Sequence, residues 1–328
     1  MEKKHVGVQI QDVPPAHVKL NRNEKFVYIT STTNCVSYQI AAIVSYPEKA
    51  DLLNTSIDNG KSLHESNKIA LLLHGSQSHK NAIYQALLAN SLSQSGYWVL
   101  RIDFRGQGDS SDNCDSTVGR TLDQDLEDMC TVYQTISDKS LRKQLYMTGT
   151  ISLDVIVAHS RGSLAMFTFY LQLLASASTL PSYLINCAGR YDGSGLIERC
   201  TRLHPNWQTE GGFRASGPRY GKYKDLWIPS SETYSIASVC VEKFAAIPST
   251  CSIMSCYGLC DHIVPLSAAS NYKELFKGRH TLTLIENADH NYYGTESDPN
   301  VLNLPTRRGR VNYSPLVVDS IMEFLGKT

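Results

Sequence analysis

The sequence has no long hydrophobic run. Its longest uninterrupted apolar runs, such as residues 69–73, have five residues, whereas a helix needs about 20 apolar residues to span a membrane. The amino-terminal stretch also lacks an apolar segment with the length of a secretory signal. We therefore expect no membrane span and a cytoplasmic location.

Neither sign of charge is in excess. Lysine and arginine together number 31, as do aspartate and glutamate, so the formal net charge is zero. Nucleic-acid binding depends on an excess of basic groups that neutralise phosphates, so we expect no nucleic-acid partner. The one short basic cluster, Arg-Arg-Gly-Arg at 307–310, is interpreted as a solvated loop.

The spacing of the cysteines argues against a metal site. The nine cysteines are scattered, and no CxxC pair or Cys/His spacing matches a zinc site. Cys187, Cys251 and Cys256 lie inside apolar runs, where a reduced cysteine behaves as a small hydrophobic residue. We expect reduced thiols, no metal and no other cofactor. The sequence leaves the oligomeric state open.

Short β-rich runs and amphipathic segments make up most of the chain. Runs at 26–30 and 38–44 are expected to pair antiparallel, and a polar loop is expected at 48–67. From residue 68 onward, apolar runs alternate with helical patterns, which is typical of parallel strands joined by crossover helices. The expected strands are 68–74, 97–103, 154–158, 182–188, 251–257 and 280–285; the expected helices are 81–95, 122–136, 163–174, 268–276 and 316–325. This pattern predicts one α/β domain with a mostly parallel central sheet and helices on both faces.

Residues 190–245 interrupt the alternation between the fourth and fifth of those strands. The segment is rich in Gly, Arg, Tyr and Trp, and excursions of this length are usually functional. We interpret it as a cap over a site. Its aromatic side chains either bind substrate or form the small core of the cap. The candidates are Tyr191, Trp207, Phe213 and Trp227, together with Tyr220 and Tyr223.

A strand at 154–158 leads into a small-x-Ser-x-Gly turn and then into an apolar helix. Ala158, Ser160 and Gly162 occupy the three defining positions. Such a turn holds the serine in a strained backbone that lifts its hydroxyl above the sheet, and the small residues let neighbouring backbone pass closely. Ser160 is therefore the candidate nucleophile, and the alternative is an ordinary helix cap.

A serine nucleophile needs a base and an acid that orients the base. His290 directly follows the last expected strand, and Asp261 follows the strand before it, so both are expected at the same sheet edge as the serine. His74 also ends a strand, and His159 is expected to point away across the turn. Asp289 is a rival acid, but an immediate neighbour of His290 cannot easily fold back onto its imidazole.

An oxyanion hole needs two backbone N–H groups. Arg161 follows the serine at the start of a helix, whose dipole favours negative charge. Ser76 follows the strand that ends in His74-Gly75, so its N–H is the second candidate. The charged stretch at 101–111 also follows a strand, but we interpret it as structural, with Asp103 and Arg105 satisfying buried loop backbone.

These motifs together resemble the α/β-hydrolase superfamily over roughly residues 25–325. They are His74-Gly75, 79–81, the Arg-Gly-x-Gly-Asp-Ser stretch in 103–111, 158–162, 189–192, Asp261 and Asp289-His290. The similar branch is that of feruloyl and cinnamoyl esterases and serine-aminopeptidase-like proteins, especially the fungal and plant intracellular members. The resemblance implies an α/β-hydrolase fold, a triad of Ser160, Asp261 and His290, and a lid formed by 190–245. Ala158 departs from the glycine that is usual at its position.

Both the residues and the resemblance predict a serine esterase that acts on a small-molecule ester through an acyl-enzyme on Ser160. An acyltransferase and a peptidase or amidase would use the same triad. A non-catalytic ligand-binding protein on this fold is a third alternative. The complete set of serine, histidine and aspartate argues against that last class, because a binding pocket does not require all three.

Overall fold

The computed structural model describes residues 5–33, 36–47, 68–113, 117–147, 151–177, 179–294 and 311–326. The predicted loop at 48–67 and the basic cluster at 307–310 lie outside the described residues.

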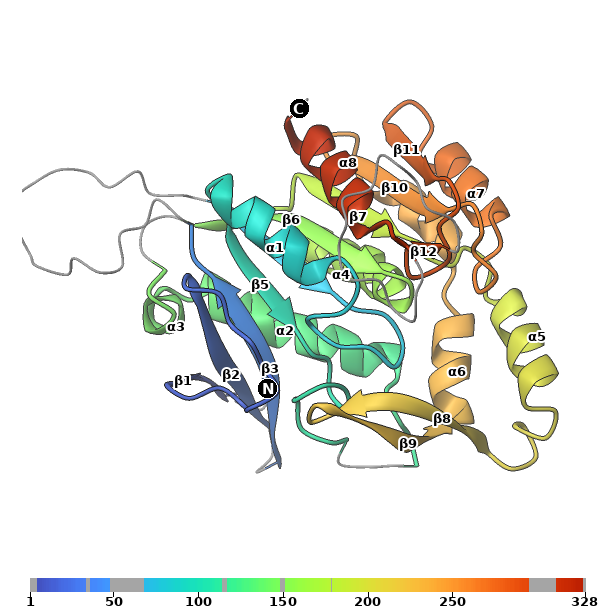
Figure 1. Ribbon diagram of the computed structural model, residues 1–328, viewed down its shortest axis with the longest axis horizontal. Coiled ribbons are helices and arrows are strands. Elements are labelled where there is room, and N and C mark those ends of the chain that lie inside the picture. The colour runs from blue at the N-terminus through green and yellow to red at the C-terminus, as the bar shows by residue number, and fades with distance from the viewer. Residues whose placement is uncertain are drawn as a thin grey trace, which may run out of the picture.

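Within these ranges, nine strands form one sheet in the order β1-β2-β3-β5-β4-β6-β7-β10-β11 (Figure 1). In this order, the neighbours β1-β2-β3-β5 pair antiparallel, and the neighbours β5-β4-β6-β7-β10-β11 pair in parallel. Their bounds are β1 (His5–Gln11), β2 (Glu24–Thr33), β3 (Val36–Ser45), β4 (Lys68–Leu73), β5 (Trp98–Ile102), β6 (Ser152–His159), β7 (Tyr183–Cys187), β10 (Ser252–Gly258) and β11 (His280–Ile285). The predicted antiparallel pair and the predicted parallel strands are confirmed.

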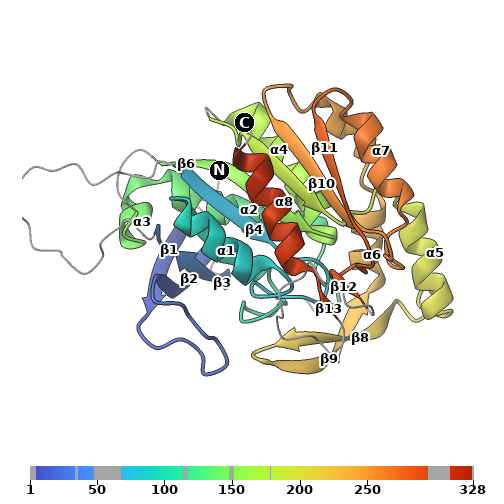
Figure 2. The same ribbon diagram turned by 45° about the horizontal axis from the view of Figure 1, so that its top comes forward.

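The sheet has a hydrophobic core on each face, because successive side chains of a strand point to opposite sides. On β4, for example, Ile69 and Leu71 belong to one core and Ala70 and Leu72 to the other. The second core is covered by α1 (Gln85–Gln94) and α8 (Ser314–Gly326), which lie side by side (Figure 2). The first core is covered by α2 (Leu122–Ser137), α4 (Arg161–Ser176) and α7 (Ser267–Leu275). These five helices match the five predicted ones.

Outside the 190–245 segment, four elements were not predicted. They are β1, α3 (Lys139–Gln144) and the two-residue strands β12 (Tyr293–Gly294) and β13 (Val311–Asn312). In β1 only Val6 is buried, but Val6, Val8 and Ile10 alternate with more polar residues, so the sequence did carry the period-two pattern of a strand and the prediction missed it. The six residues of α3 are mostly polar and too few to show a helical period.

The segment 190–245 lies between the neighbouring strands β7 and β10 and has its own secondary structure. It contains α5 (Ser194–Leu203), a hairpin of β8 (Gly212–Arg219) and β9 (Lys222–Pro229), α6 (Ser230–Ala237) and most of the 3-10 helix η1 (Val241–Ala246). In both views the hairpin, α5 and α6 lie together at one end of the sheet (Figure 1, Figure 2).

A buried ion pair joins the antiparallel and parallel parts of the sheet. Arg101 on β5 lies 2.5 Å from Glu24 on β2, and both side chains are almost fully buried. The carboxylate also accepts hydrogen bonds from the hydroxyl of Ser45 on β3 and from the N–H of Asn21. Removing one partner of such a pair leaves the other charge uncompensated in a medium of low dielectric constant.

We therefore expect the substitution Glu24→Gln to lower the free energy of unfolding by about 3 kcal/mol. Urea denaturation measures this change. The matched control is Glu274→Gln, which removes the exposed pair with Lys277 and is expected to leave the stability nearly unchanged. Equal effects of the two substitutions would contradict a structural role for the Glu24–Arg101 pair.

Candidate functional site

The loops that follow strands β6, β10 and β11 carry the predicted serine, aspartate and histidine at one edge of the parallel sheet. Ser160 directly follows β6, Asp261 lies three residues after β10, and His290 lies five residues after β11. Strands β6, β7, β10 and β11 are neighbours that run in the same direction. Their carboxyl ends therefore lie at the same edge, where open α/β sheets usually carry their sites.

Ser160 occupies a strained turn between β6 and α4. Its φ of 53° and ψ of −119° are unusual for a residue with a side chain and cost about 1–3 kcal/mol. A Cβ added at Gly162 would lie 2.8 Å from the carbonyl oxygen of His74, and one added at Gly75 would lie 3.0 Å from the Cβ of Ser160. The two glycines therefore allow the backbone of the neighbouring strand end to pass next to the serine.

The three side chains form a continuous hydrogen-bonded chain. His290 Nε2 lies 2.9 Å from Ser160 Oγ, and His290 Nδ1 lies 2.7 Å from Asp261 Oδ2. The side chains of His290 and Asp261 are only 8% and 1% exposed. Because a carboxylate only accepts, the Nδ1 of the neutral imidazole carries the proton, which leaves Nε2 free to accept from the serine hydroxyl.

The backbone around Asp261 fixes its carboxylate. Its Oδ1 accepts hydrogen bonds from the N–H groups of Ile263 and Val264, at 2.7 Å and 2.8 Å, while Oδ2 faces His290. The rival acid, Asp289, accepts instead from the N–H groups of Asn291 and Tyr293. Asp289 thus binds the turn that carries the histidine, and Asp261 is the acid that contacts the ring.

The two predicted oxyanion donors lie beside the serine. Ser76 and Arg161 both line the cavity that contains Ser160 and His290. Arg161 is the first residue of α4, so its N–H belongs to the first turn, where a helix has no internal acceptor. The N–H groups at this end also carry the positive end of the helix dipole.

A buried network of four charged side chains, which we call the charge network, surrounds the guanidinium of Arg161. The guanidinium of Arg161 lies 3.0 Å from Asp125 on α2 and 2.7 Å from Glu232 on α6. Asp125 also pairs with Arg120, the fourth member of the network. Arg120 in turn donates to the carbonyl oxygen of Gly75, next to Ser76. Burial alone would lower the pKa of Arg161, but Asp125 and Glu232 outweigh it and raise that pKa. The network therefore connects the serine turn, the 75–76 loop and the 190–245 segment.

Most of the charge network could not be predicted from the sequence. Arg161 was singled out for its backbone N–H, whereas Arg120, Asp125 and Glu232 stand in no recognisable motif. Asp125 and Glu232 meet Arg161 only because α2, α4 and α6 pack together, and the sequence does not show that packing.

Two other histidines lie near the serine but have structural contacts. His74 is buried and bridges two loops, with Nδ1 close to the Gly75 carbonyl and Nε2 accepting from the N–H of Phe104. The ring of His159 packs 5.0 Å from that of His290. Burial, and then the positive charge of Arg120, holds the pKa of His74 well below its usual value. Burial, and then the neighbouring His290, does the same to the pKa of His159. Both imidazoles are therefore neutral at pH 7.

The serine opens into a cavity of about 320 Å³ between the sheet edge and the 190–245 segment. Its apolar walls come from α4, from the 190–245 segment and from the turn after Asp261. They are formed by Leu164, Leu196, Leu203, Phe213, Ala215, Ile228, Ile236, Ile263 and Val264. This volume and lining are typical of a small-molecule site.

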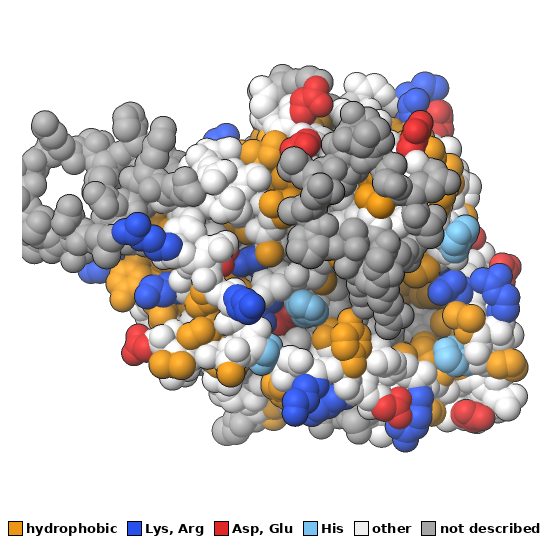
Figure 3. Space-filling view, viewed as in Figure 1, with side chains coloured by type: hydrophobic (Ala, Val, Ile, Leu, Met, Phe, Trp, Pro, Cys, Tyr) orange, Lys and Arg blue, Asp and Glu red, His pale blue; other side chains and the backbone are white. Residues whose placement is uncertain are grey.

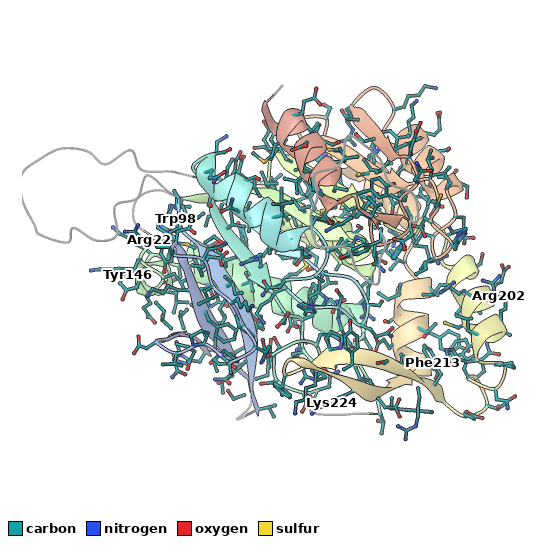
Figure 4. The ribbon with its side chains drawn as sticks, in the orientation of Figure 1. Arg22, Trp98, Tyr146, Arg202, Phe213 and Lys224 are labelled. Atoms are coloured by element: carbon teal, nitrogen blue, oxygen red, sulfur yellow. The ribbon has the colours of Figure 1, made fainter. Side chains whose placement is uncertain are left out.

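Of the four predicted substrate-binding aromatics, Phe213 lines this cavity and the other three do not. Trp207 is buried inside the segment, where it packs against Tyr234 and donates to Thr201. Tyr191 packs edge-on against Tyr272, and Trp227 is 41% exposed on β9. Figure 4 shows Phe213 on β8, at the end of the hairpin that lies next to α5 and α6. Aromatic content alone could not distinguish the cavity wall from the core of the segment.

The stretch 101–111 makes structural contacts, as predicted, although Arg105 binds α2 in place of loop backbone, through ion pairs with Glu127 and Asp128. Asp103 accepts from the N–H groups of Lys80 and Asp109 and pairs with the ammonium of Lys80. Arg105 donates to the carbonyl oxygen of Gln124. The hydroxyl of Ser110 donates to the carbonyl of Asp103. These bonds hold the loop after β5.

Searches of the described ranges find neither a metal-binding cluster nor a membrane-crossing helix. No group of three or more His, Cys, Asp or Glu side chains in these ranges has the arrangement of a metal site, and none of the helices there combines the length and apolarity of a membrane span. On the face seen in Figure 3, the described Lys and Arg side chains are scattered among Asp and Glu.

One family model and one full-length relative match the chain. The serine aminopeptidase S33 family (Hydrolase_4) matches residues 64–177. The uncharacterized protein YDL057W of Saccharomyces cerevisiae is 75% identical over 328 residues, which is 100% of both chains.

Solved structures share the fold at low sequence identity. Est1E from Butyrivibrio proteoclasticus, with ferulic acid bound, has a TM-score of 0.61 at 15% identity and is matched over 88% of this chain and 95% of its own. Alpha/beta hydrolase domain-containing protein 10 from mouse has a TM-score of 0.52 at 16% identity, with the same coverage of 88% and 95%. Together with the sheet order, these similarities show that the chain has the α/β-hydrolase fold, and the identity of 75% over its full length shows that it belongs to the family of YDL057W.

Proposed function

We propose that this protein is a serine hydrolase that cleaves carboxylic esters through an acyl-enzyme on Ser160. The observation that carries the proposal is the position of His290, which lies within hydrogen-bond distance of both Ser160 Oγ and Asp261 Oδ2. This is the geometry that activates a serine hydroxyl. The chain is proposed to act as a single α/β-hydrolase domain in which 190–245 serves as the cap.

The first half of the reaction forms the acyl-enzyme. Ser160 Oγ attacks the ester carbonyl carbon while its proton passes to His290 Nε2, and Asp261 stabilises the imidazolium that results. The tetrahedral intermediate then collapses as the bond to the alcohol oxygen breaks and His290 returns the proton to the leaving alcohol. The acyl group remains on Ser160.

The second half uses water in place of the serine. His290 removes a proton from a water molecule, whose oxygen attacks the acyl carbon. Collapse of this second tetrahedral intermediate releases the carboxylic acid and returns the proton to Ser160 Oγ. In both halves the N–H groups of Ser76 and Arg161 are the donors that face the developing oxyanion, a contribution usually worth about 3 kcal/mol per donor.

The cavity favours an ester with a substantial apolar group. Its volume of about 320 Å³ and the aliphatic side chains in its wall, with Phe213 as an aromatic contact, suit an alkyl or aromatic acyl or alcohol portion. An aromatic acyl group of the kind bound to Est1E, ferulic acid, is therefore one class to include in an ester panel.

We propose a cytoplasmic location for the protein. The seven described cysteines are all free thiols, which is typical of a reducing compartment.

Substitution of the proposed nucleophile should abolish covalent labelling. We expect a fluorophosphonate probe to label the wild-type protein and not Ser160→Ala, and kcat/KM for p-nitrophenyl butyrate to fall by about 10³-fold or more. Ser163→Ala is the matched control, because Ser163 lies one turn along α4 and its hydroxyl donates to the Ala158 carbonyl. Labelling that survives in Ser160→Ala would remove the proposed mechanism.

Substitution of each candidate aspartate, Asp261 and Asp289, should show which of them orients His290. In Asp261→Asn the amide can donate to His290 Nδ1 and so favours the tautomer in which Nε2 carries the proton and cannot accept from Ser160. We expect kcat to fall by about 10³-fold to 10⁴-fold, measured on the same ester. Asp289→Asn serves as the comparison and should retain most activity. If Asp289→Asn were the more damaging variant, Asp261 would lose its assigned role.

A further inference from the structure

Two arginines line the cavity without an acidic partner within 4 Å among the described residues. Arg190 follows β7 and Arg199 lies on α5, and both contribute to the cavity wall that also contains Ser160 and His290. Buried arginines in proteins are nearly always paired with a carboxylate or bound to an anion. The absence of a partner here calls for an explanation in terms of what enters the cavity.

The guanidinium of Arg190 is almost fully buried but contacts only a neutral acceptor. Its residue is 8% exposed, and its Nη2 donates to the carbonyl oxygen of Ile263. The two acidic groups in its vicinity are already engaged. Asp261 accepts from His290 and from two backbone N–H groups, and Asp192 accepts from the N–H and hydroxyl of Ser194.

Arg199 adds a second positive charge next to the first. Its Nη1 reaches only the carbonyl oxygen of His262, at 3.4 Å. Burial, followed by the positive charge of Arg199, lowers the pKa of Arg190 and outweighs the opposite effect of Asp261 and Asp192. The two guanidinium groups therefore repel each other, and both remain charged because an arginine in a protein stays protonated at pH 7.

A third arginine in the same cavity shows the contrast. Arg161 also lines it, but Asp125 and Glu232 lie within 3.0 Å and 2.7 Å of its guanidinium. Glu232, the one acidic side chain in the lining, is thus neutralised by Arg161. The uncompensated charge of the cavity is that of Arg190 and Arg199, and it is positive.

We propose that the cavity accepts an ester that carries an anionic group, a carboxylate or a phosphate, and that Arg190 and Arg199 bind this group while the aliphatic walls hold the rest of the molecule. The proposal deepens the ester hydrolysis proposed above and rests on it. A guanidinium offers paired N–H donors whose geometry matches both anions. An incoming anion would also relieve the repulsion between the two arginines.

Binding to the Ser160→Ala variant tests the anion site without any turnover. Isothermal titration calorimetry at low ionic strength would compare monomethyl adipate and hexyl phosphate, which are anionic, with dimethyl adipate, which is neutral. We expect at least one anion to bind tenfold or more tightly than the diester. The tighter of the two anions distinguishes a carboxylate site from a phosphate site.

Variants of the arginines show whether the preference arises from them. In the Ser160→Ala background, Arg199→Gln and Arg190→Gln should each weaken binding of the preferred anion about tenfold, and Arg190→Lys should restore part of it. The matched control is Arg202→Gln, because Arg202 lies on α5 but is exposed at the outer edge of the molecule (Figure 4). Equal affinity for anions and diester, or equal losses in Arg199→Gln and Arg202→Gln, would overturn the anion site.

A kinetic comparison separates this proposal from the proposed function. The unmodified enzyme should show a higher kcat/KM for the mono-p-nitrophenyl ester of adipic acid than for p-nitrophenyl hexanoate, and Arg199→Gln should lower that ratio about tenfold. Hydrolysis of both esters without preference would contradict the anion site and leave the esterase standing. Anion binding without hydrolysis of either ester would contradict the esterase and leave the anion site standing.

Discussion

The contact of His290 with both Ser160 and Asp261 depends on a geometric constraint of the sheet. Strands β6, β10 and β11 run in parallel and end at one edge, so residues separated by as many as 130 positions lie within 3 Å of one another. The strained turn at Ser160 then points its hydroxyl toward the imidazole. The backbone holds this turn, since the N–H of Ser160 donates to the Cys187 carbonyl at the end of β7. The cost of the strain is offset by the packing of the two cores on either side of the sheet.

The charge network makes the 190–245 segment part of the electrostatics of the serine site. Glu232 on α6 contacts Arg161, and Arg161 shares Asp125 with Arg120. Buried charges are costly unless every partner is in place, so the segment and the serine turn have fixed relative positions. The same network neutralises Arg161 and leaves Arg190 and Arg199 as the charges available to a ligand.

Most of the fold and the three residues of the proposed triad could be predicted from the sequence, because those features leave local patterns. Short apolar runs predicted the parallel strands, and the turn at 158–162 marked Ser160 by its small neighbours and its place between a strand and a helix. Position after a strand then selected His290 from ten histidines and Asp261 over Asp289. Helix α3 was missed because six mostly polar residues are too few to leave a helical pattern, whereas strand β1 was missed although Val6, Val8 and Ile10 alternate as in a strand.

The lining of the cavity could not be predicted, because it depends on tertiary packing within the 190–245 segment. Trp207 and Phe213 lie six positions apart and are both apolar, yet Trp207 fills the interior of the segment and Phe213 faces the cavity. The partners of Arg161 come from α2 and α6, far away in the sequence. The lack of an acidic partner for Arg190 among the described residues is likewise a property of the folded chain, since Asp192 is close to it in sequence but binds Ser194.

The most direct test of the site is a crystal structure of the protein after reaction with diethyl p-nitrophenyl phosphate, a reagent that transfers its phosphoryl group to an activated serine. We predict phosphorus bonded to Ser160 Oγ, with the phosphoryl oxygen about 3 Å from the backbone nitrogens of Ser76 and Arg161 and His290 still in contact with Asp261. Phosphorus on another side chain, or a phosphoryl oxygen directed away from both nitrogens, would contradict the account.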